Sequence, residues 1–197
     1  MIILNGPTGS GKSTILNQLK TEGCYVIPTY TTRPRRDTDG EDTICVTQHE
    51  FLEMLAKGEF LTTFTAHTVH GDWYYGIALH PIINMHKIAG FNSVLVSNYF
   101  FTPALKQCLL YTEPWDFSFT VFLDVDYDTI AKNKRNDNIT DKDTIDRLHR
   151  DDWKMQELKE HSDLVVMNHN FEKSPELITH QITTKYYDAI SNKGGHE

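Results

Sequence analysis

The chain has 197 residues, with 27 acidic and 19 basic side chains and a formal net charge of −8. This length suits one domain with a proper hydrophobic core, and the acidic balance excludes a general nucleic-acid binder, because phosphate contacts need a basic face. No apolar run is long enough to span a membrane, no signal peptide precedes the first apolar run, and the three cysteines lack metal-ligand spacing. We expect a cytoplasmic protein, monomeric or homodimeric, that binds neither nucleic acid nor membrane.

The chain opens on an apolar run followed by a glycine-rich loop. Residues 6–13 match the phosphate-binding pattern G-x-x-x-x-G-K-[ST] in full, and apolar residues follow at helical spacing over 15–19. Glycines leave backbone N–H groups able to wrap an anion, and a helix presents its positive N-terminus to the same anion. We predict that Lys12 reaches the terminal phosphates as a catalytic residue and that the Ser13 hydroxyl ligates Mg²⁺. The predicted ATP-binding residues are Gly6, Thr8, Gly9, Ser10, Gly11, Lys12, Ser13 and Thr14.

Beyond this loop, short apolar runs alternate with amphipathic segments. Strands are predicted at 25–27, 60–65, 94–96, 119–123 and 164–167. The first helix is expected to stop at Glu22-Gly23, and further helices are predicted from Thr47 to Gly58, from Pro81 to Gly90, from Thr102 through Leu109, over Ile145 to Leu158, and from Ser174 to Ile190. This alternation predicts an α/β fold in which a parallel sheet is covered on both faces.

Three local predictions accompany this pattern. The helix that opens on the Thr47 capping box is expected to bury Phe51, Leu52 and Leu55 on one face. Residues 70–76 are interpreted as a glycine-bounded aromatic turn. The stretch 124–143 is polar and charged and has no apolar stripe beyond Ile130.

The arginines are not distributed like the lysines, which are spread along the chain. All six fall into two groups: Arg33, Arg35 and Arg36, and then Arg135, Arg147 and Arg150. Arginine is the side chain suited to bidentate phosphate recognition. Both groups lie in stretches that interrupt the strand–helix alternation, roughly 30–88 and 126–150. We interpret this as an enzyme core with two mobile flaps that close over two substrates.

Several blocks of the sequence resemble the guanylate kinase family, and together they cover nearly the whole chain. The blocks are Gly6 to Thr14, Thr31-Thr32-Arg33, Gly58-Glu59-Phe60-Leu61, Gly71 through Gly76, and Asp163 to Asn168. The resemblance implies a three-layer P-loop fold with a central parallel sheet. Residues 1–29, 89–125 and 151–197 would form the P-loop core, 30–88 the monophosphate-binding region, and 126–150 the lid.

The resemblance also implies an activity and its residues. The activity is that of a nucleoside monophosphate kinase that uses ATP and Mg²⁺. Arg33 and Arg36 (or Arg35) match the arginines that hold the acceptor phosphate, helped by Tyr75. Arg135 and Arg147 match lid arginines that act on the transferred group, and Thr29 falls where the family places a hydroxyl near the guanine edge.

Three departures from the family pattern concern the acceptor. The tyrosine that contacts the acceptor phosphate is replaced at Thr43, and the glutamate that reads guanine is replaced by Thr62. A carboxylate at the end of a middle strand is also missing, although Asn98 there keeps a hydrogen-bonding role. Because threonine can donate or accept, Thr62 and Thr29 suit a different or broader set of bases. GMP or dGMP remains the leading candidate acceptor.

Other functions remain open at this point. A related P-loop kinase acting on another base or on a phosphorylated sugar would also lack the guanine-reading glutamate. A guanylate kinase-like module that binds a phosphorylated peptide would keep the fold without catalysis, although such modules usually lose the phosphate loop. An ATPase would need a carboxylate at the end of a strand, and Asp124 is a candidate for that role; a polar residue that ends a strand is the plainer interpretation.

Overall fold

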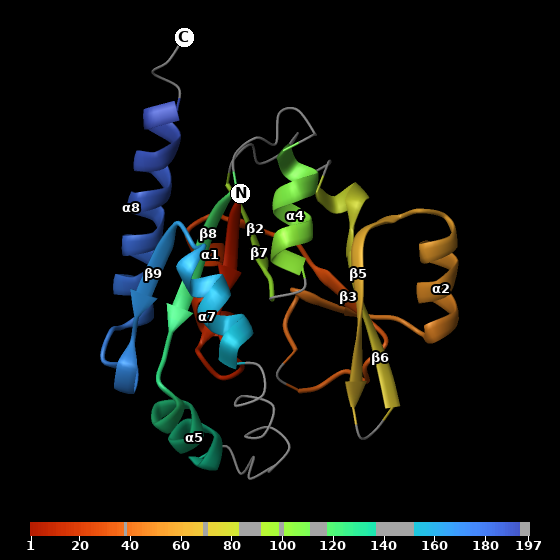
Figure 1. Ribbon diagram of the computed structural model, residues 1–197, viewed down its shortest axis with the longest axis horizontal. Helices are drawn as coiled ribbons and strands as arrows, with labels where there is room; N and C mark the ends of the chain where they lie inside the picture. Colours follow the sequence, from red (N-terminus) through yellow and green to blue (C-terminus); the bar gives the residue numbers. More distant parts are fainter. Residues whose placement is uncertain are drawn as a thin grey trace. The chain divides into compact units, whose positions relative to one another are not determined.

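In the computed structural model, the described residues are 1–37, 39–68, 71–82, 92–98, 101–110, 118–136 and 152–193. The fold is α/β. Its parallel sheet has the strand order β2-β7-β1-β8-β9, formed by Tyr25–Val26, Ser93–Val96, Ile2–Asn5, Phe119–Asp124 and Leu164–Met167. The chain divides into two compact units, one of Met1 with 23–118 and the other of 2–22 with 119–197. The prediction of a parallel α/β sheet is confirmed (Figure 1).

The unit that contains the phosphate loop is built on β1, β8 and β9. β1 pairs with β8, and β8 pairs with β9, both in parallel. The side chains of Ile2, Ile3 and Leu4 are all fully buried, and so is Val121 of β8. Consecutive buried residues on one strand mean that both faces of the sheet are covered, as the apolar runs predicted.

Among the described residues, this unit also contains helices α1 (Lys12–Thr21), α5 (Tyr127–Asn136), α7 (Asp152–Glu160) and α8 (Pro175–Lys193), and a short 3₁₀ turn η1 at His169–Phe171. The predicted stop of α1 is confirmed, because Glu22 is its C-cap and Gly23 has a positive φ of 93°. Ser174 caps α8, whose residues Ile178, Ile182 and Tyr186 are buried at four-residue spacing. α8 packs against α1, which fixes the helix that carries Lys12.

The other unit holds the β2–β7 pair and a four-stranded sheet in the order β4-β3-β6-β5. These four strands are Thr43–Cys45, Thr29–Thr31, Gly71–Ala78 and Phe60–Thr68. β3 runs parallel to β4 and antiparallel to β6, and β6 pairs antiparallel with β5. The two long strands β5 and β6 lie side by side (Figure 1).

The prediction of an aromatic turn before Gly76 is wrong. Residues 71–78 are strand β6, and Gly76 lies inside it, opposite Thr63 of β5. A Cβ on Gly76 would lie 2.6 Å from the ring of Phe60. Gly76 therefore does not mark a turn: a glycine is needed here because an aromatic ring lies directly over the strand.

Helix α2 (Gln48–Ala56) begins with the predicted capping box. Thr47 accepts the N–H of Glu50, and the Glu50 carboxylate accepts the N–H of Thr47. The prediction of its buried face is only partly right: Phe51 is buried and stacks on Phe60, whereas Leu52 and Leu55 are 44% and 46% exposed. Phe51 also stacks on Tyr74 with ring centroids 5.7 Å apart, so this side chain packs α2 against both β5 and β6.

Replacing Gly76 by alanine is expected to lower the free energy of unfolding by about 1–3 kcal/mol, because the new methyl group overpacks the Phe60 ring. Chemical denaturation of the purified variant measures this. The Gly76→Ala/Phe60→Leu double variant, in which the ring is absent, should recover part of the loss. No recovery would contradict the proposed clash.

Other predicted helices are found in part. α4 (Phe101–Leu110) agrees with the helix predicted from Thr102, and residues 79–82 are helical at the start of the one predicted from Pro81, whose remainder lies outside the described residues. α7 covers the end of the predicted 145–158 helix, and residues 137–151 lie outside the described part. Among the described residues, no helix combines the length and apolar character needed to cross a membrane.

Candidate functional site

The phosphate loop connects β1 to α1 through backbone that only glycine adopts readily. Gly6, Gly9 and Gly11 have φ values of 146°, 88° and 88°. Gly11 is the N-cap of α1. Because glycine has no side chain, no capping side chain accepts a hydrogen bond from the first N–H groups of the helix. The first turn of α1 also contains no acidic residue. These features leave the positive end of the helix suited to an anion.

Lys12 lies over this loop. Its Nζ donates hydrogen bonds to the carbonyl oxygens of Gly6 and Pro7, each at 2.7 Å. The ammonium group is thus held by the backbone of the loop that follows β1. A cation at this position is well placed to meet a phosphate group that enters the loop.

The loop is also closely packed beneath Gly6. A Cβ at Gly6 would lie 2.8 Å from both the Leu123 carbonyl oxygen and Ser10 Oγ. Ser10 is 3% exposed, and its hydroxyl oxygen has no hydrogen-bond partner among the residues that the structure describes. Thr8, Ser13 and Thr14 are exposed. The predicted ATP-binding residues therefore span the loop and the first turn of α1, where Ser13 is exposed.

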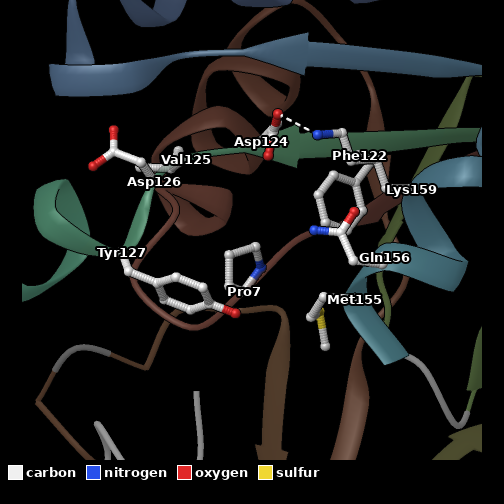
Figure 2. Close-up of a pocket in the computed structure, with 9 residues that line it drawn as sticks. All are labelled: Pro7, Phe122, Asp124, Val125, Asp126, Tyr127, Met155, Gln156 and Lys159. Carbon is white, nitrogen blue, oxygen red and sulfur yellow. Dashed lines mark hydrogen bonds and ion pairs between the residues drawn. The ribbon is translucent and has the colours of Figure 1, made fainter. Parts of the chain in front are cut away.

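A cavity of about 180 Å³ lies beside the loop. It is lined by Pro7 of the loop, by the end of β8 and the start of α5, and by Met155, Gln156 and Lys159 of α7 (Figure 2). At one end, Lys159 Nζ lies 2.8 Å from Asp124 Oδ2. This ion pair engages the carboxylate that was the candidate for a metal-binding role in an ATPase, and it ties α7 to the end of β8.

The other unit holds the first arginine group. Arg33 donates from Nη1 to Asp39 Oδ2 at 2.9 Å and from Nη2 to Asp39 Oδ1 at 2.8 Å. Nη1 also donates to the Pro34 carbonyl oxygen, and the backbone N–H of Arg36 donates to Asp39 Oδ2 at 2.7 Å. The side chains of Arg33 and Asp39 are only 11% and 9% exposed. The side chain of Arg36 is exposed.

The electrostatics of this pair follow from its geometry. The hydrogen bonds from Arg33 hold the pKa of the Asp39 carboxyl below its usual value. Asp39 in turn raises the pKa of Arg33, with smaller contributions from a hydrogen bond and a charge interaction with Tyr75. Two residues expected at the acceptor phosphate, Arg33 and Tyr75, are therefore neighbours. Asp39 was not predicted as a site residue, although it follows the first arginine group by only three residues.

The residues expected around the acceptor base share one face of the four-stranded sheet. Across β4, β3, β6 and β5, the register places Thr43, Thr29, Ile77 and Thr62 in one row. Two residues along, Tyr75 lies in the next row on the same face and stacks on Phe64 with ring centroids 5.2 Å apart. Thr29 and Thr62 are half-buried. The two threonines expected to read the acceptor base, Thr29 and Thr62, therefore flank the buried Ile77 on this face.

The remaining predicted site residues are placed differently or not described. Asn98 Oδ1 accepts the N–H of Phe101 at the start of α4, so its side-chain oxygen has a structural partner. Arg135 belongs to α5, and nothing is described of its side chain. Arg147 lies outside the described residues.

Comparison with known proteins points to one family. The family model for guanylate kinase matches residues 1–185. The guanylate kinase of Thermotoga maritima is 26% identical over 186 residues, which cover 90% of this chain and 83% of that protein. The guanylate kinase of Helicobacter pylori is 26% identical over 183 residues, covering 90% and 84%. That of Bifidobacterium longum is 37% identical over 99 residues, or 48% of each chain.

A solved structure agrees with these sequence matches. The crystal structure of guanylate kinase from Anaplasma phagocytophilum superposes with a TM-score of 0.66 at 18% identity, covering 96% of this chain and 85% of that one. At this identity the likeness concerns the fold.

Proposed function

The chain belongs to the guanylate kinase family, and on this basis we propose that it is a nucleoside monophosphate kinase that transfers the γ-phosphate of ATP to a nucleoside monophosphate, with GMP or dGMP the leading acceptor. The observation that carries the proposal is the complete phosphate loop between β1 and α1, with Lys12 held over it. A module that only bound a phosphorylated peptide would have no need of this loop.

On the donor side, the loop binds the phosphates of ATP through its backbone N–H groups, and Lys12 meets the terminal phosphates. The close packing under Gly6 and the accessible Ser13 hydroxyl fit a loop that holds a nucleotide with its metal. When bound with ATP, Mg²⁺ would be ligated by Ser13 and would neutralise charge on the phosphate oxygens. In this proposal, Arg135 and Arg147 are the lid arginines that act on the transferred phosphoryl group.

On the acceptor side, Arg33 and Tyr75 hold the phosphate, with the exposed side chain of Arg36 available to join them. The acceptor is already an ionised phosphate, so transfer needs no general base. It needs in-line positioning, neutralised charge and exclusion of water. Closure of the regions 30–88 and 126–150 over the two nucleotides would supply that exclusion.

At the acceptor base, this chain offers the hydroxyls of Thr29 and Thr62 and has Thr62 in place of the glutamate carboxylate that contacts guanine. A carboxylate that accepts two N–H bonds discriminates strongly between bases, because the wrong base leaves it unpaired. Hydroxyls that donate or accept discriminate less. We therefore propose that GMP and dGMP are preferred but that other monophosphates are also phosphorylated at measurable rates.

A turnover screen tests the proposal. ATP and Mg²⁺ are combined with each common ribo- and deoxyribonucleoside monophosphate and with a set of sugar phosphates, and ADP and diphosphate formation are both measured. We expect stoichiometric ADP and nucleoside diphosphate, fastest with GMP or dGMP. Phosphorylation of sugar phosphates alone, or ADP formed without any phosphorylated acceptor, would contradict it.

A further inference from the structure

The Arg33–Asp39 pair has the geometry of a guanidinium bound to a phosphate. Both oxygens of the carboxylate face both terminal nitrogens of Arg33, at 2.8 and 2.9 Å. Arginine makes the same two parallel hydrogen bonds with two oxygens of a phosphate group. The carboxylate therefore occupies the edge of Arg33 that an acceptor phosphate would use.

The Asp39 carboxylate also accepts a hydrogen bond from a second residue, as a bound phosphate would. The backbone N–H of Arg36 reaches Asp39 Oδ2 at 2.7 Å, and Arg35 Nη2 lies 3.3 Å from the Asp39 carbonyl oxygen. The Asp39 carboxylate thus accepts hydrogen bonds from the side chain of Arg33 and the backbone N–H of Arg36, two residues that are expected to hold the acceptor phosphate. Because the pair is about nine-tenths buried, solvent does not screen it as it would an exposed ion pair.

We propose that Asp39 is an internal competitor for the acceptor phosphate and thereby sets the affinity of the site. This inference rests on the proposed function, in which Arg33 holds that phosphate. An anion must displace the carboxylate to reach the terminal nitrogens of Arg33. A phosphomonoester dianion carries more charge than the single carboxylate and can displace it, whereas a monoanion only exchanges one charge for another. Asp39 accordingly favours terminal phosphomonoesters as acceptors.

The key variant is Asp39→Asn, which removes the charge and keeps an oxygen that can accept the Arg36 N–H. We expect the Kd for GMP and for inorganic phosphate, measured by titration calorimetry on the full chain, to fall about 5- to 10-fold. The reason is that apparent affinity rises with the fraction of molecules in which Arg33 is not already paired with the Asp39 carboxylate. The KM for the acceptor should fall likewise, with kcat unchanged. Asp39→Ser should behave in the same way, which keeps the test open if one variant folds poorly.

Two controls separate this role from a general charge effect. Asp37→Asn removes one negative charge from an exposed position in the same loop, and we expect its Kd to stay within about twofold of the parent, because exposed charges are screened. In an Arg33→Gln background, Asp39→Asn should give no gain, because the contested guanidinium is absent.

Weaker acceptor binding in both Asp39 variants would overturn the inference, because it would mean that the carboxylate holds Arg33 in a productive position. An unchanged Kd would overturn it as well. The proposed function can fail separately: if no nucleotide is turned over by the parent chain, the comparison of inorganic phosphate binding between parent and Asp39→Asn still decides whether the carboxylate competes for Arg33.

Discussion

Replacing Lys12 by alanine is expected to lower kcat for phosphoryl transfer about 10³-fold, since one charged group aimed at the developing negative charge of a transition state contributes at this level. Steady-state assays with ATP and GMP measure the loss. The fold should survive the change, because the hydrogen bonds from Lys12 Nζ to the carbonyl oxygens of Gly6 and Pro7 lie within the phosphate loop itself. A far-ultraviolet circular dichroism spectrum like that of the parent would establish this.

Lys20→Ala is the matched control for Lys12→Ala. Lys20 lies in the last turn of the same helix and is exposed. The substitution Lys20→Ala removes the same single positive charge from α1, but at the end away from the phosphate loop. We therefore expect kcat to stay near the parent value. If Lys12→Ala retained full activity, the proposed kinase mechanism would fall, and a role in binding alone would gain support.

The variant Gly6→Ala is expected to lower the free energy of unfolding by about 2–4 kcal/mol, through two effects that act together. Its φ of 146° is strained for alanine, and its methyl group would lie 2.8 Å from a backbone oxygen, that of Leu123, which cannot turn aside as a side chain can. Urea or guanidinium unfolding, followed by circular dichroism, gives the value. Binding of ATP should weaken as well, because the loop must shift to admit the methyl group.

Gly58→Ala separates the two effects. Gly58 also has a positive φ, of 69°, but a Cβ there would meet nothing within 4 Å. Its cost should therefore be the backbone strain alone, about 1–2 kcal/mol. Equal losses in the two variants would show that the contact with Leu123 contributes nothing.

Features encoded in a few neighbouring residues were predictable from the sequence. The phosphate loop, the capping box at Thr47 and the end of α1 at Gly23 each depend on local hydrogen bonds or on glycine's backbone freedom, so they can be read without knowing the tertiary structure. The buried strands β1 and β8 were equally legible, because a strand covered on both faces is a continuous apolar run.

Features that depend on distant partners were not predictable. Residues 71–76 resemble a turn because their glycines are visible in the sequence, whereas their pairing with β5 and the Phe60 ring over Gly76 are not. Helix α5 lacks an apolar stripe, and its start is stabilised by Asp126, which accepts both the N–H and the hydroxyl of Thr129. The pattern Asp126-x-x-Thr129 was the available signal. Likewise, no pattern indicated that Asp39 would pair with Arg33 rather than leave it to a ligand.

The register of β1 has a consequence for synthesis of the chain on the ribosome. β1 is made first, but β8, one of its two neighbours in the sheet, begins at Phe119, which pairs with Ile2. β5 and β6, in contrast, are joined where Thr68 pairs with Gly71, so this hairpin closes over a short loop and forms early. A nascent chain halted before residue 119 therefore carries the phosphate-loop sequence without the strand that aligns with β1 along its length. Nucleotide binding should consequently be acquired late in translation, after the hairpin has already formed.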